Sequence, residues 1–265
     1  MSNSTTWQVR RSNFDTMMLK EAEARGETVM RGTATEPLLA EDGAVRGVTV
    51  RWSDSKSEDI ETQIVLDCSG QAAFFANQRV TGPKYVGSYD KQVAFFSQVT
   101  GAVRGAGVSG EAAKDNTIIF YAKKFHWAWF IPLDKDVVSV GMVTPRADFL
   151  AKKRTPEEFF RSTLPGVNPA LTRRISDIQL VEKVHVIPNY SYQVRRFCGK
   201  GFVCVGDAHR FIDPIFSFGI SATLREAEFA VPYVLAYLEG KGRHLANHSP
   251  STCSSAKRGP ITLRT

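Results

Sequence analysis

The stretch Gly201-Phe-Val-Cys-Val-Gly-Asp-Ala-His-Arg-Phe-Ile-Asp-Pro-Ile-Phe-Ser-Phe-Gly-Ile-Ser221 joins a short apolar run to the start of a helical pattern. Residues 202–205 predict a buried strand, and Gly206 lets the backbone turn sharply where that strand ends. Asp207 then stands at the carboxyl end of the strand, which is the edge of an open α/β sheet where ligands bind. The stretch therefore predicts an α/β fold with a ligand site at this edge.

The second half of the stretch supplies further binding groups. Pro214 fixes the chain direction, and Gly219 lets a flat ligand approach the backbone closely. The amides of Phe218, Gly219 and Ile220 are first-turn donors at the positive end of a helix, where an anion or an electron-rich ring edge can bind. On spacing alone, an ordinary strand, turn and helix in which Asp207 caps a turn explains the stretch equally well.

The rest of the chain predicts α/β segments on either side of a β-rich middle. Ser12 and Asp15 form a capping box, and the apolar spacing after them predicts a core-facing helix that ends at Gly26. The middle carries apolar runs without a long helix between them, which predicts a mainly antiparallel sheet. A second capping box begins at Thr155, and a helix is predicted over residues 219–240. Strands are predicted at residues 6–10, 28–33, 45–50, 60–66, 92–99, 117–122, 127–133, 137–143, 183–187 and 190–196.

Charge and cysteine content limit the possible functions. The 34 Lys and Arg residues against 27 Asp and Glu residues give a net charge of +7, which suits either nucleic acid or an anionic cofactor. The basic residues are scattered in pairs, so no helix carries a single basic face. The four cysteines show no CxxC spacing, and we predict no metal site. No apolar run reaches the length of a membrane span, and we predict a cytoplasmic protein.

Three stretches resemble, in the correct order, motifs of the flavoprotein monooxygenase and flavin-dependent halogenase superfamily. Residues 6–15 resemble the segment that runs beside the flavin, and residues 65–70 resemble the strand that ends under the adenine half of FAD. The Gly206-Asp207 stretch resembles the second FAD-binding motif. The likeness runs from residue 6 to residue 238 and implies an FAD-binding doubly wound domain with an inserted, mainly antiparallel substrate domain.

The resemblance assigns roles to single residues. Asp207, beside Gly206, would hold the ribityl chain, and Gly219 and Ile220 would face the isoalloxazine ring. Pro214 belongs to the same motif. Arg11 and Gln8 would lie near the cofactor. His209 occupies a variable position of the motif, and we interpret it as a solvent-side histidine because no acid or ligand partner is evident.

The stretch Phe125-His-Trp-Ala-Trp-Phe-Ile-Pro132 distinguishes between members of this superfamily. In a strand, Trp127, Trp129 and Ile131 share one face. A hydrophobic sheet core alone could explain them. However, Trp-x-Trp-x-Ile-Pro resembles the signature of flavin-dependent halogenases, in which these residues and Pro132 keep organic substrate away from a flavin hydroperoxide. The hydroperoxide oxidises halide to hypohalous acid, and the resemblance places the halide at Ser217, Phe218 and Gly219.

The resemblance therefore implies a secondary-metabolism oxidoreductase that uses FAD, halide and a separate flavin reductase to halogenate a small aromatic substrate, free or carrier-tethered. An aromatic hydroxylase, a related flavin reductase and a basic nucleic-acid-binding module remain alternatives. The substrate and the choice between chloride and bromide stay open.

Domain limits follow from the same resemblance. Residues 1–82 would form the first part of the FAD-binding domain, 83–182 the β-rich substrate domain, 183–240 the second FAD-binding part, and 241–265 a disordered tail. The family cradles the FAD pyrophosphate with a Gly-x-Gly-x-x-Gly turn that follows its first strand, and residues 1–82 contain no such turn. The glycine-rich stretch at residues 101–110, which includes this spacing, lies in the β-rich middle instead. In the family, the catalytic lysine belongs to the same N-terminal part as this turn, so we assign its role to no lysine of this sequence. We therefore expect a fragment that is catalytically incomplete alone.

Overall fold

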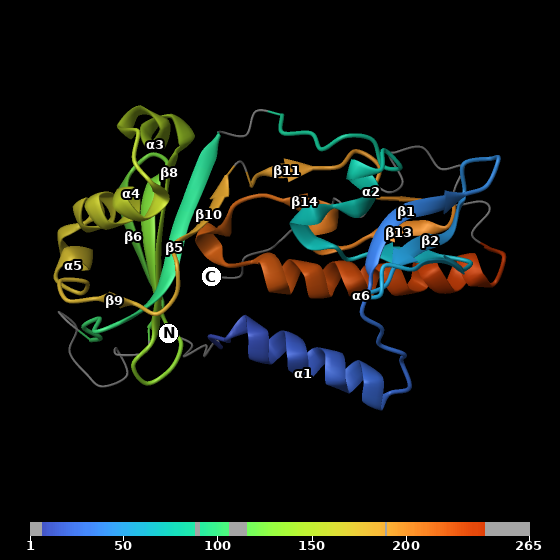
Figure 1. Cartoon of the computed structure of the whole chain (residues 1–265), viewed down its shortest axis with the longest axis horizontal. Helices are drawn as coiled ribbons and strands as arrows, with labels where there is room; N and C mark the ends of the chain where they lie inside the picture. The colour runs from blue at the N-terminus through green and yellow to red at the C-terminus, as the bar shows by residue number, and fades with distance from the viewer. Residues whose placement is uncertain (1–6, 88–90, 106–115, 189, 242–265) are drawn as a thin grey trace, which may run out of the picture. The chain divides into compact units, whose positions relative to one another are not determined.

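A computed structural model describes residues 7–87, 91–105, 116–188 and 190–241, and Figure 1 shows the elements they form. The chain divides into two compact units. The first unit joins Met1–Val29 to Asp90–Tyr190, and the second joins Met30–Tyr89 to Ser191–Thr265. The assignment of residues 1–82, 83–182 and 183–240 to cofactor and substrate domains stays a prediction. The predicted tail lies, from residue 242 on, outside the described residues.

The first unit is built on an antiparallel sheet in the strand order β10-β5-β8-β7-β6, with β9 paired to β5. This confirms the predicted antiparallel middle of the chain. Its strands are β5 (Gln92–Thr100), β6 (Ile118–Lys123), β7 (His126–Pro132), β8 (Val138–Pro145), β9 (Gln179–Leu180) and β10 (His185–Pro188).

Helices cover one face of this sheet (Figure 1). Phe95, Phe130 and Met142 project from the sheet and pack against Phe159 and Phe160 in one buried core. Each such side chain contributes about 1.5–3 kcal/mol through burial, so this core is the main stabilising feature of the unit. The covering elements are α3 (Arg146–Lys152), α4 (Pro156–Thr163), η3 (Leu164–Val167) and α5 (Pro169–Thr172).

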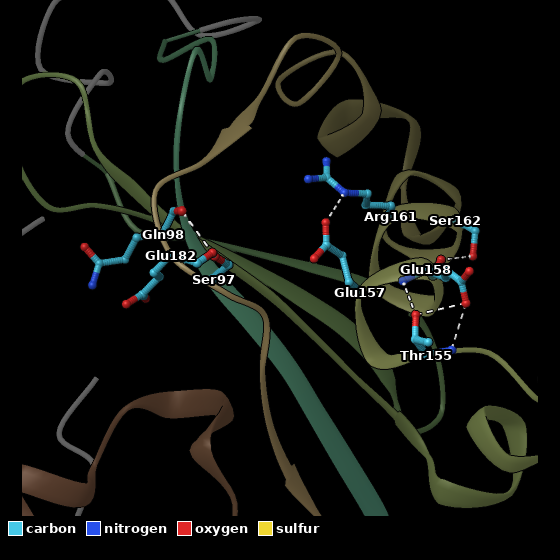
Figure 2. Close-up of polar contacts among 8 residues, drawn as sticks. All are labelled: Ser97, Gln98, Thr155, Glu157, Glu158, Arg161, Ser162 and Glu182. Atoms are coloured by element: carbon cyan, nitrogen blue, oxygen red, sulfur yellow. Dashed lines mark hydrogen bonds and ion pairs between the residues drawn. The ribbon is translucent and has the colours of Figure 1, made fainter.

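The capping box predicted at Thr155 is confirmed (Figure 2). The Glu158 amide donates to Thr155 Oγ1 at 3.3 Å, and the Thr155 amide donates to Glu158 Oε2 at 2.9 Å. Two amides that the first helical turn leaves without partners are thereby satisfied. On β5, the Ser97 hydroxyl donates to the Glu182 carbonyl at 2.8 Å, which ties the sheet to the segment before β10.

The N-terminal segment differs from its prediction. Helix α1 (Arg11–Ala24) begins two residues earlier than predicted, because its N-cap is Arg10 instead of Ser12, and no side chain caps it. None of its residues is buried, and Met17 is 56% exposed. The predicted core-facing stripe is therefore wrong, because apolar spacing alone does not supply a surface to pack on. Residues 7–10 form no strand, and instead of a strand at 28–33 the chain forms β1 from Thr33 onward.

The described residues of the second unit form two small three-stranded sheets and the two-stranded sheet β11-β14. The first has the antiparallel order β1-β2-β3, and the second has the order β12-β13-β4. In the second sheet β13 runs parallel to β4 and antiparallel to β12. The predicted strand 60–66 is split between β3 and β4. The strands of this unit are β1 (Thr33–Leu39), β2 (Val45–Arg51), β3 (Ser57–Glu61), β4 (Val65–Asp67), β11 (Tyr192–Gln193), β12 (Cys198–Gly199), β13 (Phe202–Cys204) and β14 (Arg210–Phe211).

Strand β13 is buried on both faces, as expected for a strand inside an α/β sheet. On one face Phe202 and Cys204 pack with Val45 and Phe75. On the other face Val203 packs with helix α6 (Gly219–Leu238), which contributes Ala230, Tyr233 and Val234. The quoted stretch thus forms the predicted buried strand, turn and helix, and its helix retains Pro232 in its interior.

None of the helices in the described part of the chain combines the length and the apolar character that crossing a membrane requires.

Candidate functional site

The two tryptophans lie on the sheet face opposite the helix-covered core. Ala128 and Phe130 belong to that core, whereas Trp127 and Trp129 alternate with them along β7 and point the other way. Ile131 shares the face of the tryptophans, and Pro132 ends the strand. The tryptophans are therefore not part of the main core of the unit.

An aromatic row crosses this face of the sheet. The strand register places His185, Phe96, Gly141 and Trp129 directly beside one another on β10, β5, β8 and β7. The rings of Phe96 and His185 are stacked with centroids 5.3 Å apart, and the Phe96 and Trp129 centroids are 5.9 Å apart. Trp127 follows at 5.7 Å from Trp129. The row forms a wide, rigid aromatic surface.

Two residues of β8 fix the orientation of Trp129. A Cβ atom at Gly141 would lie 2.2 Å from Cζ2 of the Trp129 indole, so only glycine lets the ring lie over the strand. The indole Nε1 donates to Ser139 Oγ at 3.1 Å. Trp127 is only 4% exposed. The indole of Trp129 is thus held by shape and by one hydrogen bond.

In the second unit, the turn after β13 forms the short helix η4 (Gly206–Ala208). Gly206 has φ = +66°, and a Cβ there would lie 2.7 Å from Thr223 Oγ1 of α6. On the other side, the Tyr192 hydroxyl donates to the Asp207 carbonyl at 2.5 Å. The backbone of Asp207 is therefore held between α6 and β11, with its carboxyl at the end of the strand.

A carboxylate of α6 binds the same turn. Glu226 Oε2 accepts from the Gly206 amide at 2.9 Å, and Glu226 Oε1 lies 3.1 Å from His209 Nδ1 and accepts from Arg210 Nε at 3.2 Å. Burial opposes the charge on Glu226, but the hydrogen bonds from His209 and Gly206 and the charge of Arg210 hold its pKa below the usual range.

His209 is buried, which corrects the interpretation of a solvent-side histidine. It is 6% exposed and its ring stacks on Phe197 with centroids 4.1 Å apart. The acid partner that sequence spacing did not reveal is Glu226, which comes from the following helix. Stacking on Phe197 and pairing with Glu226 hold the His209 ring within the turn.

The start of α6 carries the predicted anion-binding groups. Asp213 Oδ1 accepts from the Ile215 amide at 2.9 Å and caps η5 (Pro214–Phe216). Ser217 follows with φ = +53°, and Phe218 is the N-cap of α6. Among the described residues no side chain caps this helix, and a Cβ at Gly219 would meet no atom within 4 Å. The first turn of α6 thus has no capping side chain from the described residues, and there is space beside the Cα of Gly219.

Exposed aromatic rings flank these amides. Phe216 is 71% exposed, Phe218 is 56% exposed, and their centroids lie 5.9 Å apart. A flat ligand at the helix start would find two apolar rings and a row of donors. This combination matches the chemistry of a flavin ring, which has apolar faces and polar edges.

The other two residues that we predict to lie near the cofactor, Arg11 and Gln8, belong to the first unit. Arg11 begins α1, where its Nε lies 2.9 Å from Asp15 Oδ1. Gln8 Nε2 donates to Thr117 Oγ1 at 2.8 Å. Each residue thus has a partner within its own unit, and their predicted closeness to the cofactor stays a prediction.

The structure gathers the other site residues into two groups. Trp127, Trp129, Ile131 and Pro132 share β7 of the first unit. Gly206, Asp207, Pro214, Ser217, Phe218, Gly219 and Ile220 lie in the β13–α6 segment of the second unit.

Sequence reasoning missed the residues that support both groups: Gly141 and Ser139 behind Trp129, and Tyr192 and Glu226 behind Asp207. One signal was available for Glu226, because it lies seven residues after Gly219. Two helical turns place it on the helix face that begins at Gly219.

Known proteins are similar to this chain in sequence and in fold. A family model described as tryptophan halogenase matches residues 2–238. The 1H-pyrrole-2-carbonyl-[peptidyl-carrier protein] brominase of Pseudoalteromonas luteoviolacea is 29% identical over 89% of this chain and 56% of its own length. The corresponding chlorinase of Pseudomonas fluorescens is 28% identical over 85% of this chain and 49% of its own.

Solved structures agree with these matches. The structure of a flavin-dependent brominase superposes with a TM-score of 0.81 at 28% identity, over 95% of this chain and 60% of that one. The chain spans about half the length of the curated relatives it matches. Because the family model covers most of the sequence, this chain belongs to the tryptophan halogenase family of flavin-dependent halogenases.

Proposed function

We propose that this chain carries the flavin-side half of an FAD-dependent halogenase site. The observation that carries the proposal is the position of Trp127 and Trp129, which lie off the main core on an aromatic face. On that face Gly141 leaves room for the Trp129 ring and Ser139 binds its N–H, so the ring is held in a fixed orientation. The names of the relatives support halogenation over the hydroxylase and reductase alternatives.

The β13–α6 segment has groups that fit FAD. The carboxylate of Asp207 can accept two hydroxyl hydrogen bonds from the ribityl chain, next to the sharp turn at Gly206. Gly219 and Ile220 would meet the ring edge with their amides, and Pro214 directs the chain toward them. When bound and reduced, FAD supplies with O₂ the two-electron oxidation of halide to hypohalous acid. Arg11 and Gln8 are proposed near the cofactor by family resemblance alone.

The amides of Phe218 and Gly219, with Ser217 beside them, would hold the halide. An uncapped helix N-terminus carries partial positive charge, which stabilises an anion. Trp127, Trp129, Ile131 and Pro132 would form the wall that keeps an organic substrate from the oxidising centre. Oxidised halide would then be the only species that passes to the substrate, so halogenation replaces direct hydroxylation.

The relatives also suggest the partners. Two of them act on pyrrole groups carried by a peptidyl-carrier protein, and we propose a small aromatic substrate, free or carrier-tethered. A separate flavin reductase would supply reduced flavin. We propose that the reaction takes place in the cytoplasm.

A turnover assay tests the proposal with FAD, a flavin reductase, O₂, bromide and a pyrrole or phenol. If the chain carries out the whole reaction, brominated product forms and disappears when bromide is left out, and Trp129→Ala lowers the ratio of brominated to hydroxylated product. A hydroxylated product that forms without any halide dependence would favour a hydroxylase. A chain that binds FAD and yields neither product would agree with the expected catalytic incompleteness of the chain alone, whereas a chain that binds no FAD would contradict the proposal.

A further inference from the structure

We propose that Glu226 is a positioning residue of the cofactor site, whose carboxylate binds the turn of residues 206–210 to α6 and so fixes where the Asp207 side chain projects. This inference rests on the proposed function, because it assigns Asp207 to FAD. It concerns a residue that touches neither the aromatic face nor the first turn of α6.

Three donors from one turn converge on this single carboxylate. Gly206 precedes Asp207 in the sequence, whereas His209 and Arg210 follow Asp207. The contacts with Glu226 therefore lie on both sides of Asp207. The distances are 2.9 Å to Gly206, 3.1 Å to His209 and 3.2 Å to Arg210. Glu226 thus organises the turn on both sides of Asp207 without contacting the Asp207 side chain in any of these bonds.

The turn has little room to adopt another conformation. Thr223, one helical turn before Glu226, fills the space beside Gly206 that a side chain would need. On the opposite side the Tyr192 hydroxyl binds the Asp207 carbonyl, and the Val194 amide donates to the His209 carbonyl at 2.9 Å. With both sides of the turn held, the direction of the Asp207 Cα–Cβ bond is fixed together with the turn that Glu226 binds.

The charge of Glu226 is as important as its shape. Three N–H groups face its two oxygens, and a carboxylate presents only acceptors. A glutamine at this position would turn an NH₂ group toward at least one of these donors. The Gly206 amide would then lose its acceptor, or Arg210 would face an NH₂ group and His209 would keep a partner only as its other tautomer, and a lost partner is costly inside a protein. We therefore expect a change of the turn even from this isosteric substitution.

The same contacts link the two ends of the cofactor segment. Glu226 lies two helical turns after Gly219, so a bond from Glu226 to Gly206 fixes the distance between the Asp207 turn and the first turn of α6. A ligand that binds both ends needs this distance to be constant. A shift of the turn would weaken ribityl binding while leaving the helix itself intact.

The experiment compares the whole chain with its Glu226→Gln and Glu228→Gln variants. Glu228 is exposed on the same helix and is the matched control. Amide hydrogen exchange across residues 202–212 is measured without any ligand, and FAD affinity is measured by flavin fluorescence well below each melting temperature. We expect Glu226→Gln to speed exchange in this segment at least tenfold and to raise the FAD Kd at least tenfold, with Glu228→Gln unchanged in both.

The two readouts separate this inference from the proposed function. Exchange equal to wild type in Glu226→Gln overturns the positioning role, whatever FAD does. Faster exchange with an unchanged FAD Kd also overturns it, because the turn would then not direct the cofactor residue. If the wild-type chain binds no FAD, the proposed cofactor site fails, and the inference fails with it. Should Glu226→Gln not fold, Arg210→Gln replaces it, and exchange at the wild-type rate there overturns the inference.

Discussion

The aromatic face of the first unit and the Asp207 turn of the second unit are fixed in different ways. Trp129 is oriented by strand register and by the missing side chain of Gly141, with a single hydrogen bond to Ser139. The Asp207 turn is held by hydrogen bonds from Tyr192 and to Glu226. The first region should therefore respond to changes of volume, and the second to changes of charge.

The largest expected effect tests whether the space at Gly141 determines the orientation of Trp129. In Gly141→Ala the new methyl group would overlap the Trp129 indole, and overpacking of this kind costs about 3 kcal/mol. Urea unfolding, followed by tryptophan fluorescence, measures the loss. The control is Gly166→Ala, because a Cβ there would meet no atom within 4 Å. Equal stability of the two variants would contradict the steric account of Trp129.

The second prediction uses pH to test whether the charge of Glu226 stabilises the Asp207 turn. The pKa of Glu226 is lowered in the folded chain, so its ionised form stabilises the fold above the unfolded pKa of about 4.3. That contribution is lost as the pH falls through the lower folded pKa. We expect wild type to exceed Glu226→Gln in stability by about 2 kcal/mol at pH 6, and by much less at pH 3.

Urea unfolding at both pH values gives this difference, and Glu228→Gln controls for general charge effects. A gap between wild type and Glu226→Gln that stays constant from pH 6 to pH 3 would show that the charge of Glu226 does not stabilise the turn.

The smallest expected effect tests how much the hydrogen bond to Ser139 contributes to the orientation of Trp129. Ser139→Ala removes the acceptor of the Trp129 indole N–H, and loss of such a bond costs about 1 kcal/mol. Because Gly141 still leaves room for the ring, we expect the fluorescence maximum of the folded chain to change little. A loss as large as that of Gly141→Ala would mean that the hydrogen bond, rather than the shape, orients Trp129.

Local patterns predicted the regular parts of the fold. Alternating apolar residues gave the strands around Trp129, and the capping box at Thr155 gave the start of α4. The helix at Gly219 and the buried strand before Asp207 were also predicted. Each of these depends on neighbours within a few residues, which is the range that sequence periodicity reports.

The predictions that were wrong or absent concern contacts between residues that lie far apart in the sequence. His209 was interpreted as solvent-side because its acid lies 17 residues further on, in α6. The apolar spacing around Met17 predicted a buried face that α1 does not have, since periodicity says nothing about a packing partner. Gly141 carries no local signal either, because its role follows from the strand register with Trp129. Supporting residues of a site are therefore the hardest to predict from one sequence.

The most direct test of the account is the FAD affinity of the Asp207 turn. Calorimetric titration of FAD is carried out on the whole chain, on Asp207→Asn and on the control Asp59→Asn, which changes an exposed carboxylate of β3 in the same unit. We predict saturable binding to wild type and to Asp59→Asn, and at least tenfold weaker binding to Asp207→Asn, which corresponds to about 1.4 kcal/mol. Equal affinities of wild type and Asp207→Asn would contradict the assignment of Asp207 to the cofactor.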